Sequence, residues 1–311
     1  MLGNTVLTTS LSEIKKMEAH YSPFLSPKVP AGGVFAAKTP GCAITAYKSG
    51  KVLFQGRDGE SEAAKWGQPS SSAGPSPKQQ PISAKLPAQI SSMSIIGSDE
   101  VGTGDYFGPI TVVAAYVKKQ DLELLKELGV QDSKNLKDDK IIAIAKQLVE
   151  FVPYSLLTLH NQKYNQMQGS GMSQGKLKAL LHNQAIGHVL NKIAPEKPEA
   201  ILIDQFAKEE IYYSHLKGKQ NIIRDKVYFS TKAEGIHLAV AAASMIARYA
   251  FVKHFEKLGE KAGFTLPKGA GSQVDLAAAR LIKSKGTECL PEFVKLHFAN
   301  TDKAMRLARK D

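Results

Sequence analysis

Cysteine is scarce in this chain of 311 residues. The two cysteines, Cys42 and Cys289, stand far apart and have no Cys-x-x-Cys spacing around them. A disulfide framework needs several paired cysteines, and zinc sites built on thiolates need clustered ones. The sequence therefore argues against both, and it fits a protein of a reducing compartment.

Long apolar segments are absent as well. No run of about 18 apolar residues occurs, so we expect no membrane-spanning helix and no membrane partner. The opening segment, MLGNTVLTTSLSEIKKMEAH, lacks a basic stretch followed by an apolar one, which is the pattern of a secretory signal. We therefore expect a soluble, cytoplasmic protein.

Acidic residues are outnumbered by basic ones. The chain has 29 Asp and Glu against 41 Lys and Arg, and its formal net charge is +12. A charge of that size favours a polyanionic partner, and nucleic acid is the leading candidate. The alternative that charge alone leaves open is a soluble cationic enzyme without such a partner.

Composition changes sharply in one region. Residues 57–91 have the highest content of Ser, Pro, Gln and Gly, and their centre, GQPSSSAGPSPKQQP, offers nothing to bury. We therefore predict a small domain at 1–66, a flexible linker at 67–91 and a larger domain at 92–311.

The two predicted domains differ in class. In the first, the order is a helix at 11–21, then alternating strand segments, then a short helix, which predicts a small α+β fold. In the second, strands and helices alternate, which predicts an α/β fold. The first two strands of that domain are joined by a loop short enough for an antiparallel pair. Its expected strands are 94–100, 110–117, 154–160, 199–206 and 227–234, and its long helices are 173–194 and 236–259.

Acidic residues stand at the ends of three predicted strands, and they are Asp99, Glu100, Asp204 and Glu234. Buried carboxylates are costly unless they are paired or bound to metal, and a divalent cation relieves the repulsion within a cluster of them. Mg²⁺ and Mn²⁺ prefer oxygen ligands, and two such ions can catalyse phosphodiester hydrolysis. Taken singly, Asp204 is better explained as a helix N-cap and Glu234 as a favourable charge at a helix start. Taken together in a basic chain, the acids favour a metal site.

Sequence motifs then indicate a known family. GSDEVGTGDYFGP, residues 97–109, strongly resembles the first active-site motif of the type 2 ribonucleases H. Further matches follow in order: QDSKNL at 131–136, ILIDQ at 201–205 and KAEGIHLAVAAASMIAR at 232–248. The resemblance covers about residues 92–300, and it implies a ribonuclease H-like mixed sheet flanked by helices.

Two departures from the general pattern favour one subgroup. The related ribonuclease HII pattern has an Arg in the glycine loop and an Asp at the last acid, whereas this sequence has Thr103 and Glu234. Both changes resemble ribonuclease HIII. The additional first domain does so too, because in that subgroup it resembles the TATA-binding protein. That likeness suggests binding to a groove of the substrate duplex, although a role in stability or self-association explains a small α+β domain equally well.

The resemblance implies endonucleolytic hydrolysis of the RNA strand of RNA–DNA hybrids by two Mg²⁺ or Mn²⁺ ions, with 5′-phosphate and 3′-hydroxyl products. It places the family's catalytic and metal-binding acids at Asp99, Glu100, Asp204 and Glu234. Under the resemblance, Asp99 is the candidate ligand of both ions, and Glu100 and Asp204 are expected to complete the coordination. Glu234 is expected to bind the ion on the nucleophile side or to position the attacking water.

Five further residues are candidate substrate ligands: Gly102, Thr103, Gly104, Ser133 and Lys134. Glycines let a backbone approach a sugar-phosphate chain closely, so the loop is expected to contact ribose 2′-hydroxyls. Without the family match, a tight turn between two strands explains a Gly-x-Gly equally well. Lys134 and Ser133 are expected to bind phosphate, and an N-cap role for Ser133 is compatible with that.

Two polar residues of the last motif have structural explanations. Ser244 stands among alanines, and helix packing explains it slightly better than substrate contact does. His237 follows Glu234 by three residues, and a structural role explains it better than proton transfer.

Other functions stay open at this point. Cleavage at single ribonucleotides embedded in DNA, as in ribonuclease HII, is the alternative within the family, and Thr103 argues against it. A transposase or resolvase also has clustered acids, but the motifs at 131–136 and 232–248 do not suggest one. A hybrid-binding module without activity is the third alternative, and the presence of all the acids argues against it. We expect a monomer with no obligatory protein partner.

Overall fold

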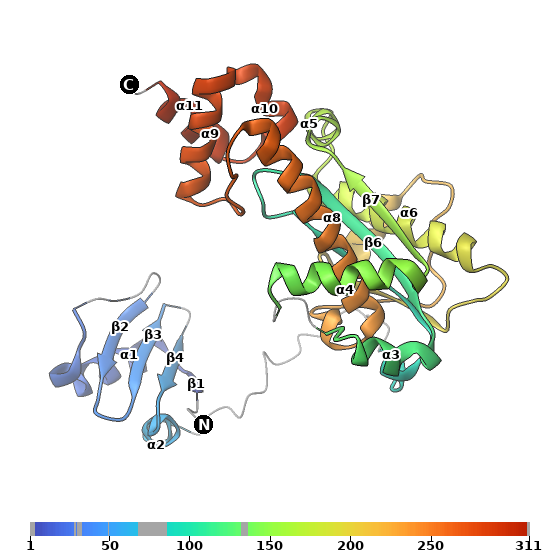
Figure 1. The fold of residues 1–311 in the computed structure, drawn as a ribbon. Coiled ribbons are helices and arrows are strands. Elements are labelled where there is room, and N and C mark those ends of the chain that lie inside the picture. Colours follow the sequence, from blue (N-terminus) through green and yellow to red (C-terminus); the bar gives the residue numbers. More distant parts are fainter. Residues whose placement is uncertain are drawn as a thin grey trace. The chain divides into compact units, whose positions relative to one another are not determined.

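The computed structural model describes residues 4–27, 29, 33–48, 50–67, 86–131 and 136–309. The chain divides into two compact units, Met1–Pro81 and Ile82–Asp311. In Figure 1 the described part of the first unit is blue, and that of the second runs from green to red. Each unit has hydrophobic core of its own, so each is described by itself. Among the described residues, no helix is long and apolar enough to cross a membrane.

The described part of the first unit is a four-stranded antiparallel sheet with two α-helices, and the strand order is β1-β4-β3-β2. Ile14 and Met17 of α1 pack with Phe35, Ile44 and Phe54 of the sheet in one core. The elements are β1 Asn4–Thr8, α1 Leu11–His20, a 3-10 turn Ser22–Phe24, β2 Gly33–Lys38, β3 Ala43–Tyr47, β4 Lys51–Gln55 and α2 Gly59–Ala64.

Strand β1 corrects the sequence-based prediction, which placed the first helix before any strand. Among its described side chains Leu7 is the buried one, so the segment has no clear alternation to mark it. It becomes a strand by pairing with β4, with Val6 opposite Leu53. Strands β3 and β4 pair antiparallel, and Ser49 between them lies outside the described residues.

The second unit is built on a mixed sheet, which confirms the predicted fold class. Its described strands have the order β7-β6-β5-β8-β9. β5 and β6 are antiparallel, as expected from their short connection, and so are β6 and β7, whereas β5, β8 and β9 are parallel. The strands are β5 Ile95–Val101, β6 Ile110–Val117, β7 Tyr154–Leu159, β8 Ala200–Asp204 and β9 Val227–Ser230.

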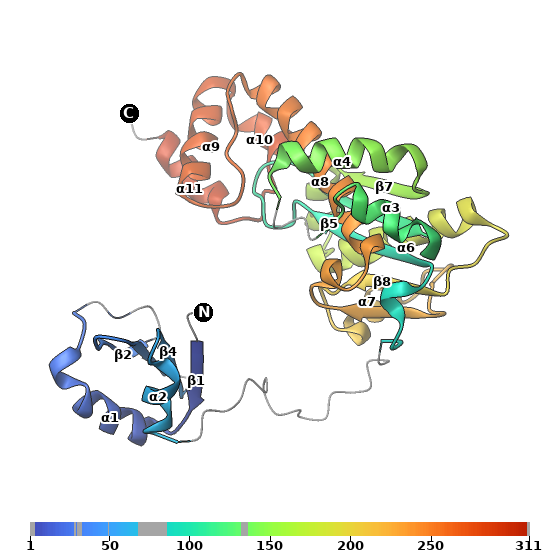
Figure 2. The same ribbon diagram turned by 60° about the horizontal axis from the view of Figure 1, so that its bottom comes forward.

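Helices cover both faces of this sheet (Figures 1 and 2). Successive residues of β5 divide between the two sides: Ile95 belongs to the core under α4 and α8, and Ile96 to the core under α6 and α7. The α-helices are α3 Leu122–Glu127, α4 Asp138–Phe151, α5 Asn161–Gly169, α6 Gln174–Ile193, α7 Glu209–Leu216, α8 Leu238–Ala262, α9 Ser272–Lys285, α10 Leu290–Phe293 and α11 Asn300–Ala308. Short 3-10 turns occur at Ile90–Ser92, Lys119–Asp121, Ala233–Gly235 and Thr287–Cys289.

Helix α8 lies directly against β5 because both contribute small residues. A Cβ atom at Gly97 would lie 2.3 Å from the carbonyl carbon of Ala239 and 2.3 Å from the backbone nitrogen of Val240. No side chain fits in that space, so glycine is required there. The run AVAAAS of α8 therefore allows the helix to reach the strand that ends in the predicted acids.

The loop from β5 to β6 is enclosed by the C-terminal helices. Tyr106 and Phe107 of this loop are fully buried and pack with Phe251 of α8 and with side chains of α9, α10 and α11. Figure 1 shows these helices, in red, gathered at one end of α8. Apolar side chains of these helices thus pack against the glycine loop and hold it in place.

Candidate active site

Parallel strand pairing brings two of the predicted acids together. Ser98 of β5 lies opposite Ile203 of β8, so Asp99 and Asp204 follow at the same edge of the sheet. Asp204 does not cap the next helix, since the N-cap of α7 is Lys208. The N-cap explanation of this acid is therefore wrong.

Glu234 reaches the same edge by a different route from the one predicted. Strand β9 ends at Ser230, and Glu234 lies in the 3-10 turn Ala233–Gly235 that precedes α8. The backbone nitrogen of Ala233 donates to Oδ1 of Asp204 at 2.8 Å. This bond ties the turn that carries Glu234 to the end of β8.

Like Glu234, which is 4% exposed, Asp99 is buried on the α8 side, with 6% of its surface exposed. Its pKa is raised well above the usual range, first by burial and then by the charges of Glu100, Asp204 and Glu234. Ser244 of α8 donates a hydrogen bond to Asp99, which opposes that rise in pKa. Ser244 therefore belongs to the site, and the packing explanation from the sequence is incomplete.

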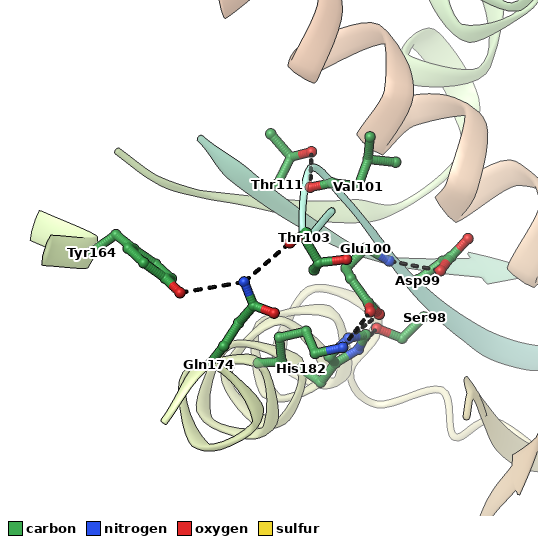
Figure 3. A network of polar contacts seen from close by, with 10 residues as sticks. Ser98, Asp99, Glu100, Val101, Thr103, Thr111, Tyr164, Gln174 and His182 are labelled. Carbon is green, nitrogen blue, oxygen red and sulfur yellow. Dashed lines mark hydrogen bonds and ion pairs between the residues drawn. The ribbon is translucent and has the colours of Figure 1, made fainter. Parts of the chain in front are cut away.

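Glu100 faces the other side of the sheet, because successive strand residues alternate. Lys178 Nζ of α6 donates to its Oε1 at 2.9 Å. His182 Nε2 lies 3.0 Å from its Oε2 (Figure 3). Ser98 Oγ lies 2.7 Å from His182 Nδ1 and extends the network. Burial alone would raise the pKa of Glu100, but the hydrogen bond and charge of His182, with Lys178, outweigh burial and lower the pKa to about 2.

Sequence reasoning missed the side chains of α6 that reach the site. Gln174, Lys178 and His182 recur at every fourth residue and so lie along one helix face. Gln174 Nε2 donates to the carbonyl oxygen of Thr103 at 3.1 Å and to the hydroxyl of Tyr164 at 3.3 Å (Figure 3). The available signal was the spacing of these three polar residues along one face of α6.

The predicted groups line one pocket of about 510 Å³. All four predicted acids and the glycine loop belong to its wall: Asp99, Glu100, Asp204, Glu234, Gly102, Thr103 and Gly104. Ser133 and Lys134 lie outside the described residues, and the wall resumes at Leu136 and Asp138. Asp138 accepts from Arg248 Nε at 2.9 Å and from Lys268 Nζ at 2.5 Å, which fixes the start of α4 against α8.

The two glycines of the loop differ in whether the fold requires a residue without a side chain. Gly102 has a φ of +96°, and a Cβ there would lie 2.2 Å from the carbonyl oxygen of Pro109 and 2.8 Å from the ring of Phe251. Gly104 has no heavy atom within 4 Å of the corresponding position, and its φ is outside the left-handed region. A tight turn therefore explains Gly102 and leaves Gly104 unexplained.

A buried lysine holds the same loop from the C-terminal side. Lys295 has no exposed surface, and its Nζ donates to the carbonyl oxygens of Asp105 at 2.7 Å and Gly108 at 2.6 Å. Burial lowers its pKa to about 7, although the charge of Asp105 acts in the opposite direction. The backbone nitrogen of Gly269 also donates to Oδ1 of Asp105, at 2.6 Å.

His237 has the structural role that the sequence favoured. It is the N-cap of α8, where its Nδ1 accepts from the backbone nitrogen of Ala239 at 2.9 Å. Its Nε2 donates to the carbonyl oxygen of Met93 at 3.0 Å, so both ring nitrogens are engaged. Burial lowers its pKa to about 4, which keeps the ring neutral near pH 7.

Comparison with known proteins identifies the family of this chain. Residues 96–301 match the family described as Ribonuclease HII. Ribonuclease HIII of Bacillus subtilis (strain 168) is 59% identical and covers 99% of both chains. Ribonuclease HIII of Bacillus cereus (strain ATCC 10987 / NRS 248) is 58% identical over 99% of this chain and 100% of that one. The chain belongs to the ribonuclease HIII family. As a member of it, the protein is a metal-dependent nuclease.

Solved structures support the ribonuclease HIII fold. The crystal structure of Bst-RNase HIII in complex with Mn²⁺ is 48% identical, covers 99% of this chain and 100% of that one, and gives a TM-score of 0.71. Aquifex aeolicus RNase H3 shares the fold at 22% identity and a TM-score of 0.54, with 94% of this chain and 98% of that one covered. Residues 4–79 match a family described as Domain of unknown function (DUF3378), in agreement with the expected extra domain.

The chemistry of the pocket fits a hard divalent cation. All the predicted ligands are carboxylates, and the raised pKa of Asp99 reflects its burial first and then their mutual repulsion. Within the described residues, no three His, Cys, Asp or Glu side chains already form a metal cluster. Glu100 is paired with Lys178 and His182 of α6, so its carboxylate is turned toward that helix.

Proposed function

We propose that this ribonuclease HIII chain hydrolyses the RNA strand of RNA–DNA hybrids endonucleolytically and leaves 5′-phosphate and 3′-hydroxyl ends. The observation that carries the proposal is a single pocket in which carboxylates stand beside a loop whose backbone is open at Gly104. The acids supply oxygen ligands for metal, and the open backbone supplies a surface for a sugar-phosphate chain.

The proposed ligands of two Mg²⁺ or Mn²⁺ ions are Asp99, Glu100, Asp204 and Glu234. Such ions, when bound, activate a water molecule and stabilise the leaving oxygen of a phosphodiester. The chain itself orients the carboxylates, and the hydrogen bonds from Ser244, Ala233 and His182 support that role. Hydrogen-bond partners of this kind orient the ligands of a metal site.

The glycine loop is the proposed reader of the RNA strand. A ribose 2′-hydroxyl is both donor and acceptor and is absent from DNA, so contacts to it select RNA. Gly102 gives the loop its turn, Gly104 gives close approach, and Thr103 adds a hydroxyl between them. We also propose Ser133 and Lys134 as phosphate ligands, from the family motif that contains them.

The first unit is proposed to bind the hybrid duplex. Its own core supports an independently folded domain, which we place at 1–66, with a linker at 67–91 and the catalytic domain at 92–311. The net charge of the whole chain, +12, supports a polyanionic ligand. We propose that the protein acts as a monomer without an obligatory protein partner.

A cleavage assay tests the reaction and the acidic site together. Labelled RNA–DNA hybrid, RNA–RNA duplex, DNA–DNA duplex and DNA with one embedded ribonucleotide are incubated with wild type and Asp99→Asn, in Mg²⁺, Mn²⁺ or EDTA. We expect metal-dependent cutting of the hybrid's RNA strand that is lost in Asp99→Asn. Tight binding without cutting would favour a binding module, and preferred cutting at the single ribonucleotide would favour activity of the ribonuclease HII type.

A further inference from the structure

A second polar pocket lies between the start of α5 and the C-terminal half of α8. Its volume is about 230 Å³, and its wall begins with Pro109, just after the glycine loop. Among the described residues, it shares no wall residue with the acidic pocket. The functional interpretation of the motifs leaves this pocket without a role.

The wall of this pocket contains a buried donor without an acceptor. Asn161, the first residue of α5, is 2% exposed, and its Nδ2 has no hydrogen-bond partner within the part of the chain that the structure describes. A buried amide left in that state is costly, and such groups normally bond to protein or to a bound molecule. The orphaned donor is a sign that something outside the chain completes this site.

The first turn of α5 adds further donors at the same place. The initial backbone amides of a helix have no partners within the helix, and the positive end of its dipole attracts anions. The N-cap of α5 is His160, whose side chain makes no capping hydrogen bond. The helix start thus leaves its anion-binding capacity available beside Asn161.

The charge around the pocket is mainly positive. Lys257 and Lys261 lie one turn apart on α8, and His254 precedes Lys257 by three residues. Among the described wall residues the single acid is Glu292, which pairs with Lys261. Lys257 has no ion-pair partner among the residues that the structure describes. Burial and the neighbouring charges of His160 and Lys257 lower the pKa of His254, as expected where cationic groups crowd.

The pocket is held in shape by bonds behind α5. Asn165 Nδ2 donates to the carbonyl oxygens of Pro291 at 3.2 Å and Val294 at 2.8 Å, and its Oδ1 accepts from the backbone nitrogen of Leu296 at 3.0 Å. The rings of His160 and His254 meet edge to face, with centroids 4.9 Å apart. A site already fixed in this way loses little entropy when it binds a ligand.

We propose that this pocket is an anion site that takes a phosphate group, with Asn161 Nδ2 and the first turn of α5 as donors and Lys257 as the main charge. A volume of about 230 Å³ has room for several water molecules of about 30 Å³ each, and so for a tetrahedral anion. The phosphate comes either from the backbone of a bound nucleic acid or from a free phosphate-bearing molecule. The proposal does not depend on the reaction at the acidic pocket.

Calorimetric titration with sodium phosphate against sodium chloride at equal ionic strength tests the site. The proteins are wild type, Asn161→Asp, Lys257→Ala and Lys253→Ala. Lys253 is the matched control, because it lies on α8 one turn before Lys257, outside the pocket, and pairs with Glu256. We expect wild type and Lys253→Ala to bind phosphate alike, Lys257→Ala to bind about threefold to tenfold more weakly, and Asn161→Asp to lose binding. Lys257 is exposed, so its variant keeps the test valid if Asn161→Asp folds poorly.

Binding of a labelled RNA–DNA hybrid in EDTA identifies the source of the phosphate. If a backbone phosphate occupies the pocket, Lys257→Ala weakens hybrid binding and lowers the slope of log K against log salt by about 0.7–0.9, while Lys253→Ala keeps the wild-type slope. A free phosphate compound as ligand leaves hybrid binding equal in both variants and changes only the phosphate titration. The proposal is overturned if neither titration separates the pocket variants from Lys253→Ala, and Asn161 is then satisfied by water alone.

Discussion

Replacing either glycine of the loop by alanine separates structural need from contact with substrate. Gly102→Ala puts a methyl group 2.2 Å from the carbonyl oxygen of Pro109, in a backbone conformation that L-residues avoid. Gly104→Ala puts the same group into a space with no heavy atom within 4 Å. The two changes are chemically identical and two residues apart, so each is the control for the other.

The expected stability changes have opposite signs. An alanine at a compatible glycine position stabilises by about 0.4–1 kcal/mol, because it restricts the unfolded chain. For a unit of this size 1 kcal/mol corresponds to about 2–4 °C, so Gly104→Ala should raise Tm by about 1–4 °C. A left-handed alanine costs about 1–3 kcal/mol, and the overlap with Pro109 adds to that cost. Gly102→Ala should therefore lower Tm by roughly 4 °C or more.

The activity measurements decide what Gly104 is for. If a sugar-phosphate chain lies against this residue, the added methyl group displaces it, and a displacement near 1 Å costs about 100-fold in rate. We expect Gly104→Ala to lose about 10- to 100-fold in kcat/KM on RNA–DNA hybrid while its Tm does not fall. Wild-type cleavage by a fully folded Gly104→Ala protein would refute the reasoning that its backbone meets the substrate.

The remaining predictions concern the acids, the buried lysine and the first unit. Asp99→Asn should abolish cleavage yet raise Tm by about 2 °C or more, since it removes a buried charge beside other carboxylates; a lower Tm would contradict this. Mg²⁺ or Mn²⁺ should raise the Tm of wild type and have a smaller effect on Asp99→Asn, which thermal unfolding in metal or EDTA measures. The folded-state pKa of Lys295, about 7, lies below its ordinary 10.5, so the unfolded chain binds the proton more tightly. Stability from this group is lowest below pH 7 and rises from pH 7 toward 10.5, and urea unfolding should show that rise in wild type but not in Lys295→Met. Deleting residues 1–81 should weaken hybrid binding and leave the Tm of the rest unchanged, and equal affinity would remove the proposed role of the first unit.

Local chemistry made much of the second unit predictable. Asp204 follows the buried aliphatic run of β8, and Asp99 follows the buried Ile95 and Ile96 after a glycine and a serine. Buried apolar runs are strong strand signals. The antiparallel start of the sheet followed from the short connection at residues 102–109. Glu234 was assigned to the correct edge with the wrong local structure, because a 3-10 turn has no pattern that separates it from the end of a strand.

Long-range partners were beyond prediction from one sequence. His182 lies 82 residues from Glu100, and nothing in the spacing of α6 says which strand it faces. The burial of Lys295 was equally unpredictable, because lysines are almost always exposed and the sequence shows no sign that this one is buried. Strand β1 failed for a related reason, since its pairing with β4 supplies what its own five residues lack.

The anchoring of the glycine loop bears on when the nuclease becomes competent during synthesis. The bonds that fix this loop come from Gly269, Phe293 and Lys295, which are translated after the strands of the sheet and the predicted acids. A nascent chain can already have its sheet and its carboxylates while the loop still lacks these anchors. Cutting activity should therefore arise only after residues 269–295 have been translated and folded, so that a product truncated before them binds nucleic acid through its positive charge without cleaving it.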